Sequence, residues 1–134
     1  SPRNAWVASF VGNPPMNLVR VRVSGSELVS ADGALRLPLP EAYRGLVKEG
    51  QEVLAGFRPE HATVGGGRLR GKVTMIERAG AYTVLHVAVG GTTVRLVQPS
   101  LGTYSAGDEV LFDVPPEAVS LYDAASGVNL ARRG

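Results

Sequence analysis

Apolar and polar residues alternate in short segments along most of this chain, and a period of two is typical of half-buried β-strands. The alternation is clearest at 19–23, where three valines are separated by two arginines. Further short strands are predicted at 27–30, 34–37, 53–57 and 69–76. Glycine and proline turns separate these segments, as in sandwiches and barrels, so the fold class is predicted to be all-β.

The clearest hairpin signal is the Gly90-Gly91 pair, which lies between two runs rich in β-branched residues. A two-residue glycine loop suits the primed turns that connect hairpin strands. The register that follows from this loop pairs Val87 with Val94 on the core-facing side. On the other face it pairs His86 with Arg95, and both are predicted to point outward.

The start of the chain departs from the strand pattern. Apolar residues at 6, 7, 10 and 11 recur at helical spacing, and Gly12 ends the run before two prolines. A short leading helix is therefore predicted over 1–12.

The chain is predicted to form two lobes. The triple glycine at 65–67 is interpreted as a linker between a lobe at 16–64 and a second lobe at 68–123, which could exchange strands. An internal echo supports this division, since residues 50–60 and 107–117 are identical at six of eleven positions. Each copy combines a glycine turn, a strand and a proline that stops the strand. Glycine turns before strands are also common without any such relation.

Composition excludes several classes of protein. The 134 residues contain no cysteine, so disulfide frameworks, thiol nucleophiles and cysteine-based zinc sites are ruled out. The 14 basic and 12 acidic side chains give a net charge of only +2, too little to indicate a polyanion-binding protein. No apolar run reaches the roughly 18 residues of a membrane span. The start has no signal-peptide pattern, so a cytosolic location is expected.

A search for catalytic or cofactor-binding motifs is negative. No GxxxxGK[ST] loop occurs, so the chain is expected neither to bind nor to hydrolyse ATP and is not predicted to be an enzyme. His61 and His86 lack metal-site spacing, so no metal ligand is assigned. Arg68, Arg70 and Lys72 alternate on one strand face. Without aromatic stacking platforms beside them, this face is interpreted as solvated, not as a nucleic-acid surface.

Four segments carry a resemblance to a known family. They are WVASFVGNPPMN at 6–17, LAGFRPEH at 54–61, VTMIERAG at 73–80 and PEAVSLYDAASG at 116–127. In this order they resemble the stretches FVAxFIGSPPMN, LGIRPEH, VEVVERLG and PExxHLFDAxTG of the C-terminal regulatory domain of maltose-type sugar ABC transporter ATP-binding subunits. The family order is kept over nearly the whole chain, so the match is specific.

The resemblance implies two intimately packed lobes, one of oligonucleotide-binding (OB) type and one of TOBE type. It also implies an N-terminal ATPase domain, absent from this sequence, which in the intact parent would bind ATP and magnesium. The implied partners are a second copy of the chain, that ATPase domain, the membrane permease subunits reached through it, and an effector protein, with no nucleic acid. The implied location is cytoplasmic, peripheral to the inner face of the cell membrane.

The motif residues are expected to have structural roles. The prolines before Asn17 should form a rigid corner, and Arg58 and Glu60 should pair locally or with a neighbouring strand. Tyr82 and Ser120 depart from the acidic residue and the histidine common in the family, which argues against an inherited small-ligand or effector site. The positions carried over from the motifs are Gly12, Pro14, Pro15, Asn17, Arg58, Pro59, Glu60, His61, Glu77, Gly80, Pro116, Glu117, Asp123 and Gly127.

The expected function is that of the regulatory and dimerisation domain of an ABC importer ATP-binding subunit, for sugars or glycerol phosphate. One alternative is a barrel that binds a small sugar or oxyanion, which saturable solute binding would favour. Another is a single-stranded nucleic-acid-binding OB barrel, supported only by the basic strand faces. A steep loss of oligonucleotide binding with added salt would favour this last alternative.

Overall fold

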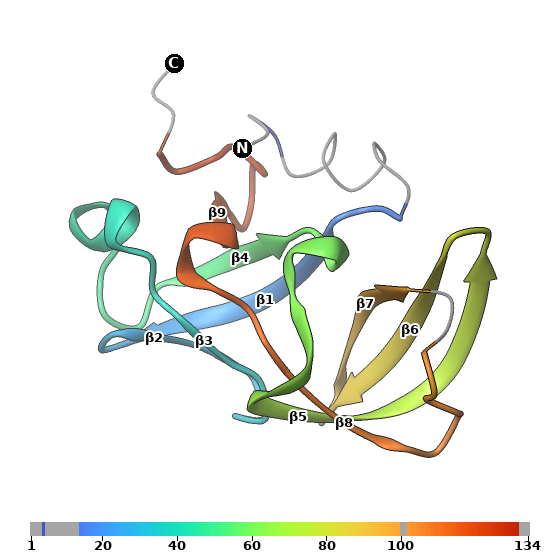
Figure 1. Cartoon of the computed structure of the whole chain (residues 1–134). Helices are drawn as coiled ribbons and strands as arrows, with labels where there is room; N and C mark the ends of the chain where they lie inside the picture. The colour runs from blue at the N-terminus through green and yellow to red at the C-terminus, as the bar shows by residue number, and fades with distance from the viewer. Residues whose placement is uncertain (1–3, 5–13, 100–101, 132–134) are drawn as a thin grey trace.

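The computed structural model of the chain describes residue 4 and residues 14–99 and 102–131. The leading helix predicted over 1–12 therefore lies outside the described residues, apart from Asn4, which forms an isolated β-bridge with Val128. The regular secondary structure of the described part is strand apart from short 3₁₀ turns, which confirms the all-β prediction. Figure 1 shows two sheets side by side, with β5 and β8 of the second sheet at the bottom of the view.

The first sheet has the strand order β3-β2-β1-β4-β9, and all its neighbouring strands are antiparallel. Its strands are β1 (Asn17–Ser24), β2 (Glu27–Ser30), β3 (Arg36–Pro38), β4 (Glu52–Phe57) and β9 (Ser120–Asp123).

The second sheet has the order β7-β6-β5-β8 and is also antiparallel. Its strands are β5 (Thr63–Ala79), β6 (Tyr82–Val89), β7 (Thr92–Pro99) and β8 (Glu109–Asp113). The described part has three short 3₁₀ turns. η1 (Glu41–Leu46) connects β3 and β4 within the first sheet, whereas η2 (Pro59–His61) and η3 (Pro116–Ala118) connect strands of different sheets.

The two lobes repeat one arrangement, since β3-β2-β1-β4 and β7-β6-β5-β8 have the same order when the strand numbers are shifted by four. The internal echo lies at equivalent places in this repeat. The backbone N–H of Gly50 donates to the carbonyl of Val23 at 2.8 Å, and that of Gly107 donates to Val73 at 2.7 Å. Each copy then continues through a strand into a 3₁₀ turn, β4 into η2 and β8 into η3. The echo is therefore a repeat of structure as well as of sequence.

The last strand does not stay with the lobe that precedes it. β9 lies within 68–123, yet it pairs with β4 in the first sheet, with Leu121 opposite Ala55 and Tyr122 opposite Leu54. The two sheets are thus connected through β9, which follows β8 in sequence but lies beside β4 in the first sheet (Figure 1).

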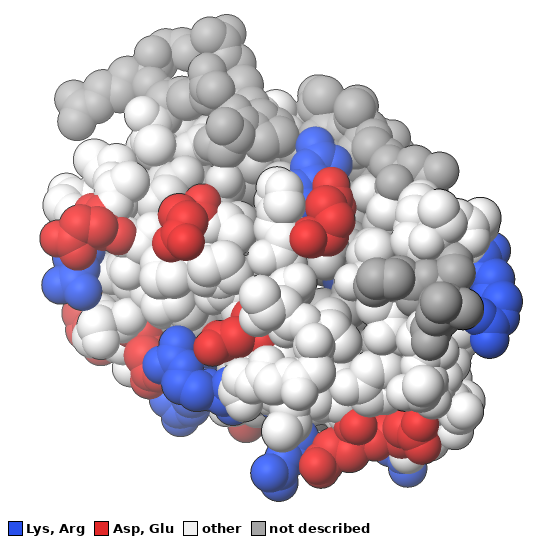
Figure 2. All heavy atoms as spheres, viewed as in Figure 1, with Lys and Arg blue, Asp and Glu red and all other residues white. Residues whose placement is uncertain are grey.

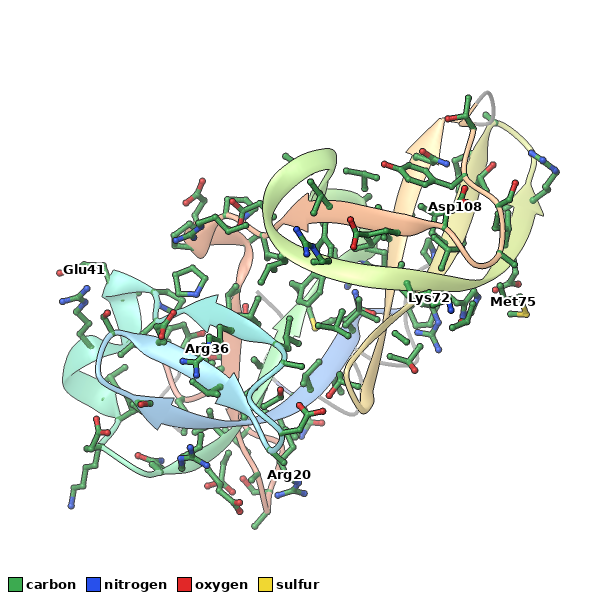
Figure 3. The ribbon with its side chains drawn as sticks, turned by 90° about the horizontal axis from the view of Figure 1, so that it is seen from below. Arg20, Arg36, Glu41, Lys72, Met75 and Asp108 are labelled. Atoms are coloured by element: carbon green, nitrogen blue, oxygen red, sulfur yellow. The ribbon has the colours of Figure 1, made fainter. Side chains whose placement is uncertain are left out.

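The interpretation of the triple glycine as a linker is wrong. Residues 65–67 lie inside β5, at a register shift between Val64 and Leu69 where the strand bends around β8 (Figure 3). Gly67 has φ +139°, and a Cβ there would lie 2.3 Å from the carbonyl oxygen of Phe112. The glycines are needed because the backbone of β5 approaches that of β8 closely here. The sequence analysis interpreted them instead as a flexible linker.

The predicted β6–β7 register is confirmed, with Val87 opposite Val94 and His86 opposite Arg95. Val87 and Val94 are fully buried in a core that contains residues of both sheets. The opposite face is less open than predicted, because the start of β1 lies near it. His86 and Arg95 line a cavity of about 400 Å³ together with residues 15–18.

Candidate functional site

The described end of the first motif, residues 14–17, forms a corner between the two sheets. Pro14 and Pro15 occupy a turn, and Asn17 opens β1 with only 4% of its surface exposed. The Nδ2 of Asn17 donates to the carbonyl of Arg95 at 2.8 Å, and the backbone N–H of Arg95 donates to Oδ1 of Asn17 at 2.8 Å. The side-chain amide of Asn17 thereby makes the two hydrogen bonds that a neighbouring strand would otherwise make to Arg95 at the outer edge of β7.

The second motif meets the first at this corner. Asn17 is the register partner of Phe57, the last residue of β4, and η2 follows directly. Within η2, Pro59 is buried whereas Glu60 and His61 are exposed. The turn packs against β7. The expected pairing of Arg58 with Glu60 stays a prediction.

The third motif lies at the far end of the β5–β6 hairpin. Gly80 has φ +70° in its turn, a conformation that favours glycine. The carboxylate of Glu77 contacts Nε2 of the His86 ring across the hairpin. This pair explains why His86 is largely covered, a contact that the predicted register alone did not reveal.

The fourth motif includes η3 and β9 and lies beside β4 of the first sheet. Pro116 and Glu117 are exposed in η3, and Asp123 ends β9. The Asp123 carboxylate accepts hydrogen bonds from the backbone N–H groups of Ser126 at 2.7 Å and Ala125 at 3.1 Å. The Ser126 N–H chiefly, and then its hydroxyl, hold the pKa of Asp123 below its usual value.

The motif residues are thus spread over several corners and do not converge on one catalytic centre. Gly12 lies outside the described residues, while Gly127 is buried with φ +74° after the Asp123 turn. In the described part of the chain, no group of three or more His, Asp or Glu could hold a metal ion. No helix in that part is long and apolar enough to cross a membrane.

Sequence reasoning missed a contact between two turns. The Asp32 carboxylate, between β2 and β3, accepts a hydrogen bond from the backbone N–H of Gly91, between β6 and β7. A Cβ on Gly90 would lie 2.4 Å from Oδ2 of Asp32. Both turns were predicted, but the contact joins residues far apart in sequence and left no local signal.

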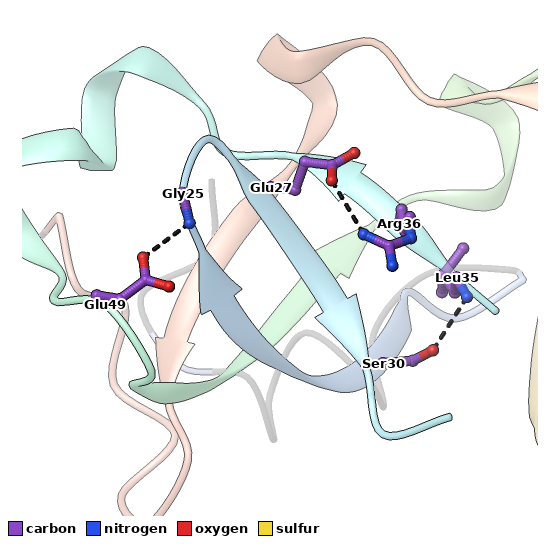
Figure 4. A network of polar contacts seen from close by, with 6 residues as sticks. All are labelled: Gly25, Glu27, Ser30, Leu35, Arg36 and Glu49. Atoms are coloured by element: carbon purple, nitrogen blue, oxygen red, sulfur yellow. Dashed lines mark hydrogen bonds and ion pairs between the residues drawn. The ribbon is translucent and has the colours of Figure 1, made fainter. Parts of the chain in front are cut away.

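Sequence reasoning also missed an open cleft of about 670 Å³ between the first sheet and β5. It brings Arg36, from the edge strand β3, into the same cleft as Arg68 and Arg70. Nη1 of Arg36 donates to Oε1 of Glu27 at 3.1 Å (Figure 4). The lining is Ser24, Gly25, Ser26, Glu27, Ala34, Arg36, Pro38, Arg68, Leu69 and Arg70. The alternation of Arg68 and Arg70 was visible in the sequence, whereas the arrival of Arg36 depends on how the sheets pack.

Surface charge does not form one broad basic field on the face in Figure 2, where lysine and arginine are interspersed with aspartate and glutamate. Exposed ion pairs account for part of this mixing, such as Arg44 Nε with Glu41 Oε2 at 2.9 Å. This face therefore lacks the basic stripe typical of nucleic-acid-binding barrels.

The two interlocked lobes and their motif corners define a β-barrel domain of the OB and TOBE class. Comparison with known families agrees: residues 55–121 match the TOBE domain, and residues 12–62 match the MalK OB fold domain. The chain belongs to the TOBE domain family, in the form found in ATP-binding subunits of ABC importers.

Three curated relatives illustrate the similarity. The chain is 33% identical over 132 residues to the sulfoquinovosyl glycerol transport ATP-binding protein SmoE of Agrobacterium fabrum, covering 93% of the chain and 36% of SmoE. It is 30% identical over 130 residues to the maltose/maltodextrin import ATP-binding protein MalK of Photorhabdus laumondii, covering 90% and 35%. It is 33% identical over 89 residues to the sn-glycerol-3-phosphate import ATP-binding protein UgpC of Bordetella parapertussis, covering 66% and 25%. The chain therefore spans about a quarter to a third of the length of these relatives.

One solved structure is similar in fold. The cytoplasmic molybdate-binding protein ModG, with molybdate bound, superposes with a TM-score of 0.63 at 20% identity, covering 78% of this chain and 94% of ModG. At this identity the likeness concerns the fold alone.

Proposed function

We propose that this chain is the regulatory and dimerisation domain of the ATP-binding subunit of an ABC importer. The observation that carries the proposal is the ordered match to the MalK OB fold domain and the TOBE domain, over residues 12–62 and 55–121. The named relatives, all ATP-binding proteins of importers, support the same assignment.

The proposal assigns chemistry to the parent and not to this chain. An N-terminal ATPase domain would bind ATP and magnesium, hydrolyse the ATP and contact the membrane permease subunits. The present chain would pair with its twin and receive an effector protein. Its place would be on the cytoplasmic side, at the inner face of the cell membrane.

A sugar or glycerol phosphate is the proposed transported solute. The relatives are named for sulfoquinovosyl glycerol, maltose or maltodextrin, and glycerol 3-phosphate, all polyhydroxylated solutes. Two of the three carry a negatively charged group.

Self-association is tested by sedimentation equilibrium of the chain from micromolar to millimolar concentration. Pairing of regulatory domains should use one self-complementary patch around a twofold axis. Stable interfaces bury roughly 1,200–2,000 Å² in total, so a domain of this size should form a weak dimer whose population rises with concentration. A strict monomer throughout the range would remove dimerisation from the proposal.

The regulatory role is tested in the full-length subunit assembled with its permease. Deleting residues 14–131 should leave basal ATP hydrolysis measurable and abolish its inhibition by effector or accumulated solute. A deletion variant that is still inhibited to the wild-type extent would contradict the regulatory role.

A further inference from the structure

The cleft between the first sheet and β5 is lined by three arginines, and each of them lies near one carboxylate. Glu27 also lines the cleft, whereas Asp113 and Glu109, the partners of Arg68 and Arg70, are outside the lining. Arg36 comes from β3, while Arg68 and Arg70 alternate along β5, so the charges approach from two different strands. Guanidinium groups from two strands give an anion more than one direction of contact.

Arg68 and Arg70 are held more loosely by their carboxylate partners than Arg36 is by Glu27. Arg68 Nε lies 3.7 Å from Oδ2 of Asp113, and Arg70 Nε lies 3.4 Å from Oε2 of Glu109. Both distances exceed the usual N–H···O range, and all four side chains are substantially solvent-accessible. Exposed pairs of this kind contribute little, and each contact uses Nε and leaves the two Nη groups available.

The open edge of β3 adds a backbone donor. The bonds from Leu39 N–H to Ser26 and from Ser30 N–H to Leu35 place the odd-numbered residues of this segment in hydrogen-bonded pairs with β2. Because antiparallel pairs alternate, the backbone N–H of Arg36 points away from β2, toward the open edge of the sheet.

The size and lining of the cleft indicate what kind of anion fits. A volume of about 670 Å³ is much larger than a bare oxyanion and suits a small organic ligand. The lining contains hydroxyl groups from Ser24 and Ser26 but no aromatic ring, so it favours a polar body over a stacked base. Arginine matches the geometry of phosphate oxygens through paired N–H groups.

We propose that this cleft binds a small, polar phosphate ester, with Arg68 and Arg70 on its phosphate group. Arg36 contacts the same phosphate from β3, and Glu27 accepts a hydrogen bond from a hydroxyl of the ligand body. This binding does not depend on the proposed transporter role, because it concerns the isolated chain.

Isothermal titration of the chain with glucose 6-phosphate, at fixed ionic strength in chloride, tests the proposal. Saturable binding is expected, weaker for inorganic phosphate and absent for glucose. The double variant Arg68→Ala, Arg70→Ala should bind about a hundredfold more weakly, since each of the two lost charge-assisted contacts costs about tenfold. Lys72→Ala is the matched control, because Lys72 continues the same alternation on β5 but does not line the cleft.

Several outcomes would overturn the proposal. Equal weakening by Lys72→Ala would mean that net charge alone attracts the anion. Lack of saturation by glucose 6-phosphate would exclude a soluble ester. Binding only to vesicles that contain phosphatidylglycerol would identify a lipid headgroup as the source of the phosphate. Thermal denaturation of each variant checks that an exposed arginine was removed without loss of the fold.

Discussion

The carboxylate of Asp32 accepts a hydrogen bond of 2.7 Å from the backbone N–H of Gly91 and so joins the β2–β3 turn to the β6–β7 turn. The same carboxylate accepts bonds from the N–H of Ala34 at 3.0 Å and the hydroxyl of Ser30 at 3.2 Å. These donors, the Gly91 N–H first among them, hold the pKa of Asp32 below its model-peptide value of 3.8. The two joined turns occupy equivalent positions in the two lobes.

The Asp32→Asn variant should be less stable than the wild type at neutral pH. Its free energy of unfolding should also fall less steeply as the pH is lowered. A carboxylate whose pKa is lowered by folding stabilises the protein above its unfolded pKa, and this contribution is lost as the pH falls through the folded pKa. The loss should therefore occur below about pH 4. Urea unfolding at intervals from pH 6 to pH 2 measures it. Glu117→Gln, on the exposed η3 turn, is the control for the removal of one carboxylate. An unchanged pH dependence in the Asp32 variant would contradict the assignment.

Replacing Asn17 by alanine should cost about 1–3 kcal/mol, because the N–H and carbonyl of Arg95 lose their amide partner in a partly buried position. Thr93→Ala, at an exposed position on the same strand, should change stability by no more than about 0.5 kcal/mol. Chemical denaturation of both variants gives the comparison. Similar small losses in the two would show that the edge of β7 does not need Asn17.

Gly66 and Gly67 make a matched pair for the bend in β5. Alanine at 67 should destabilise by at least about 2 kcal/mol, because its φ is +139° and the new Cβ would meet the Phe112 carbonyl. Alanine at 66 meets nothing within 4 Å and should be neutral or stabilising by up to about 1 kcal/mol. Thermal and urea unfolding of the two single variants decide the point. Equal tolerance at both positions would restore the linker interpretation.

Local patterns predicted the parts of the fold that depend on neighbours in sequence. The β6–β7 register followed from the Gly90-Gly91 loop, since two residues suffice to fix it. The triple glycine was misread because its partner, Phe112, lies on a strand far along the chain. The carboxylate of Asp32 likewise finds its donor 59 residues away, at Gly91.

The cleft could not be predicted from the sequence either, because its lining residues are far apart in the chain. The basic alternation of Arg68 and Arg70 was noticed and interpreted as a solvated face, which is how such faces usually behave. Only the packing of β3 beside β5 brings Arg36 to them. Sequence patterns identify which side chains share a strand face, whereas the packing of the sheets decides which faces meet.

The position of β9 affects how the protein folds while it is being synthesised on the ribosome. The edge of β4 that β9 covers is made first, and its partner begins at Ser120, some sixty residues after Phe57. At about 5–20 residues per second, that edge waits several seconds for the strand that completes its sheet. An uncovered strand edge invites pairing with other chains. The nascent polypeptide is therefore prone to aggregation until β9, near the end of the domain, has been translated.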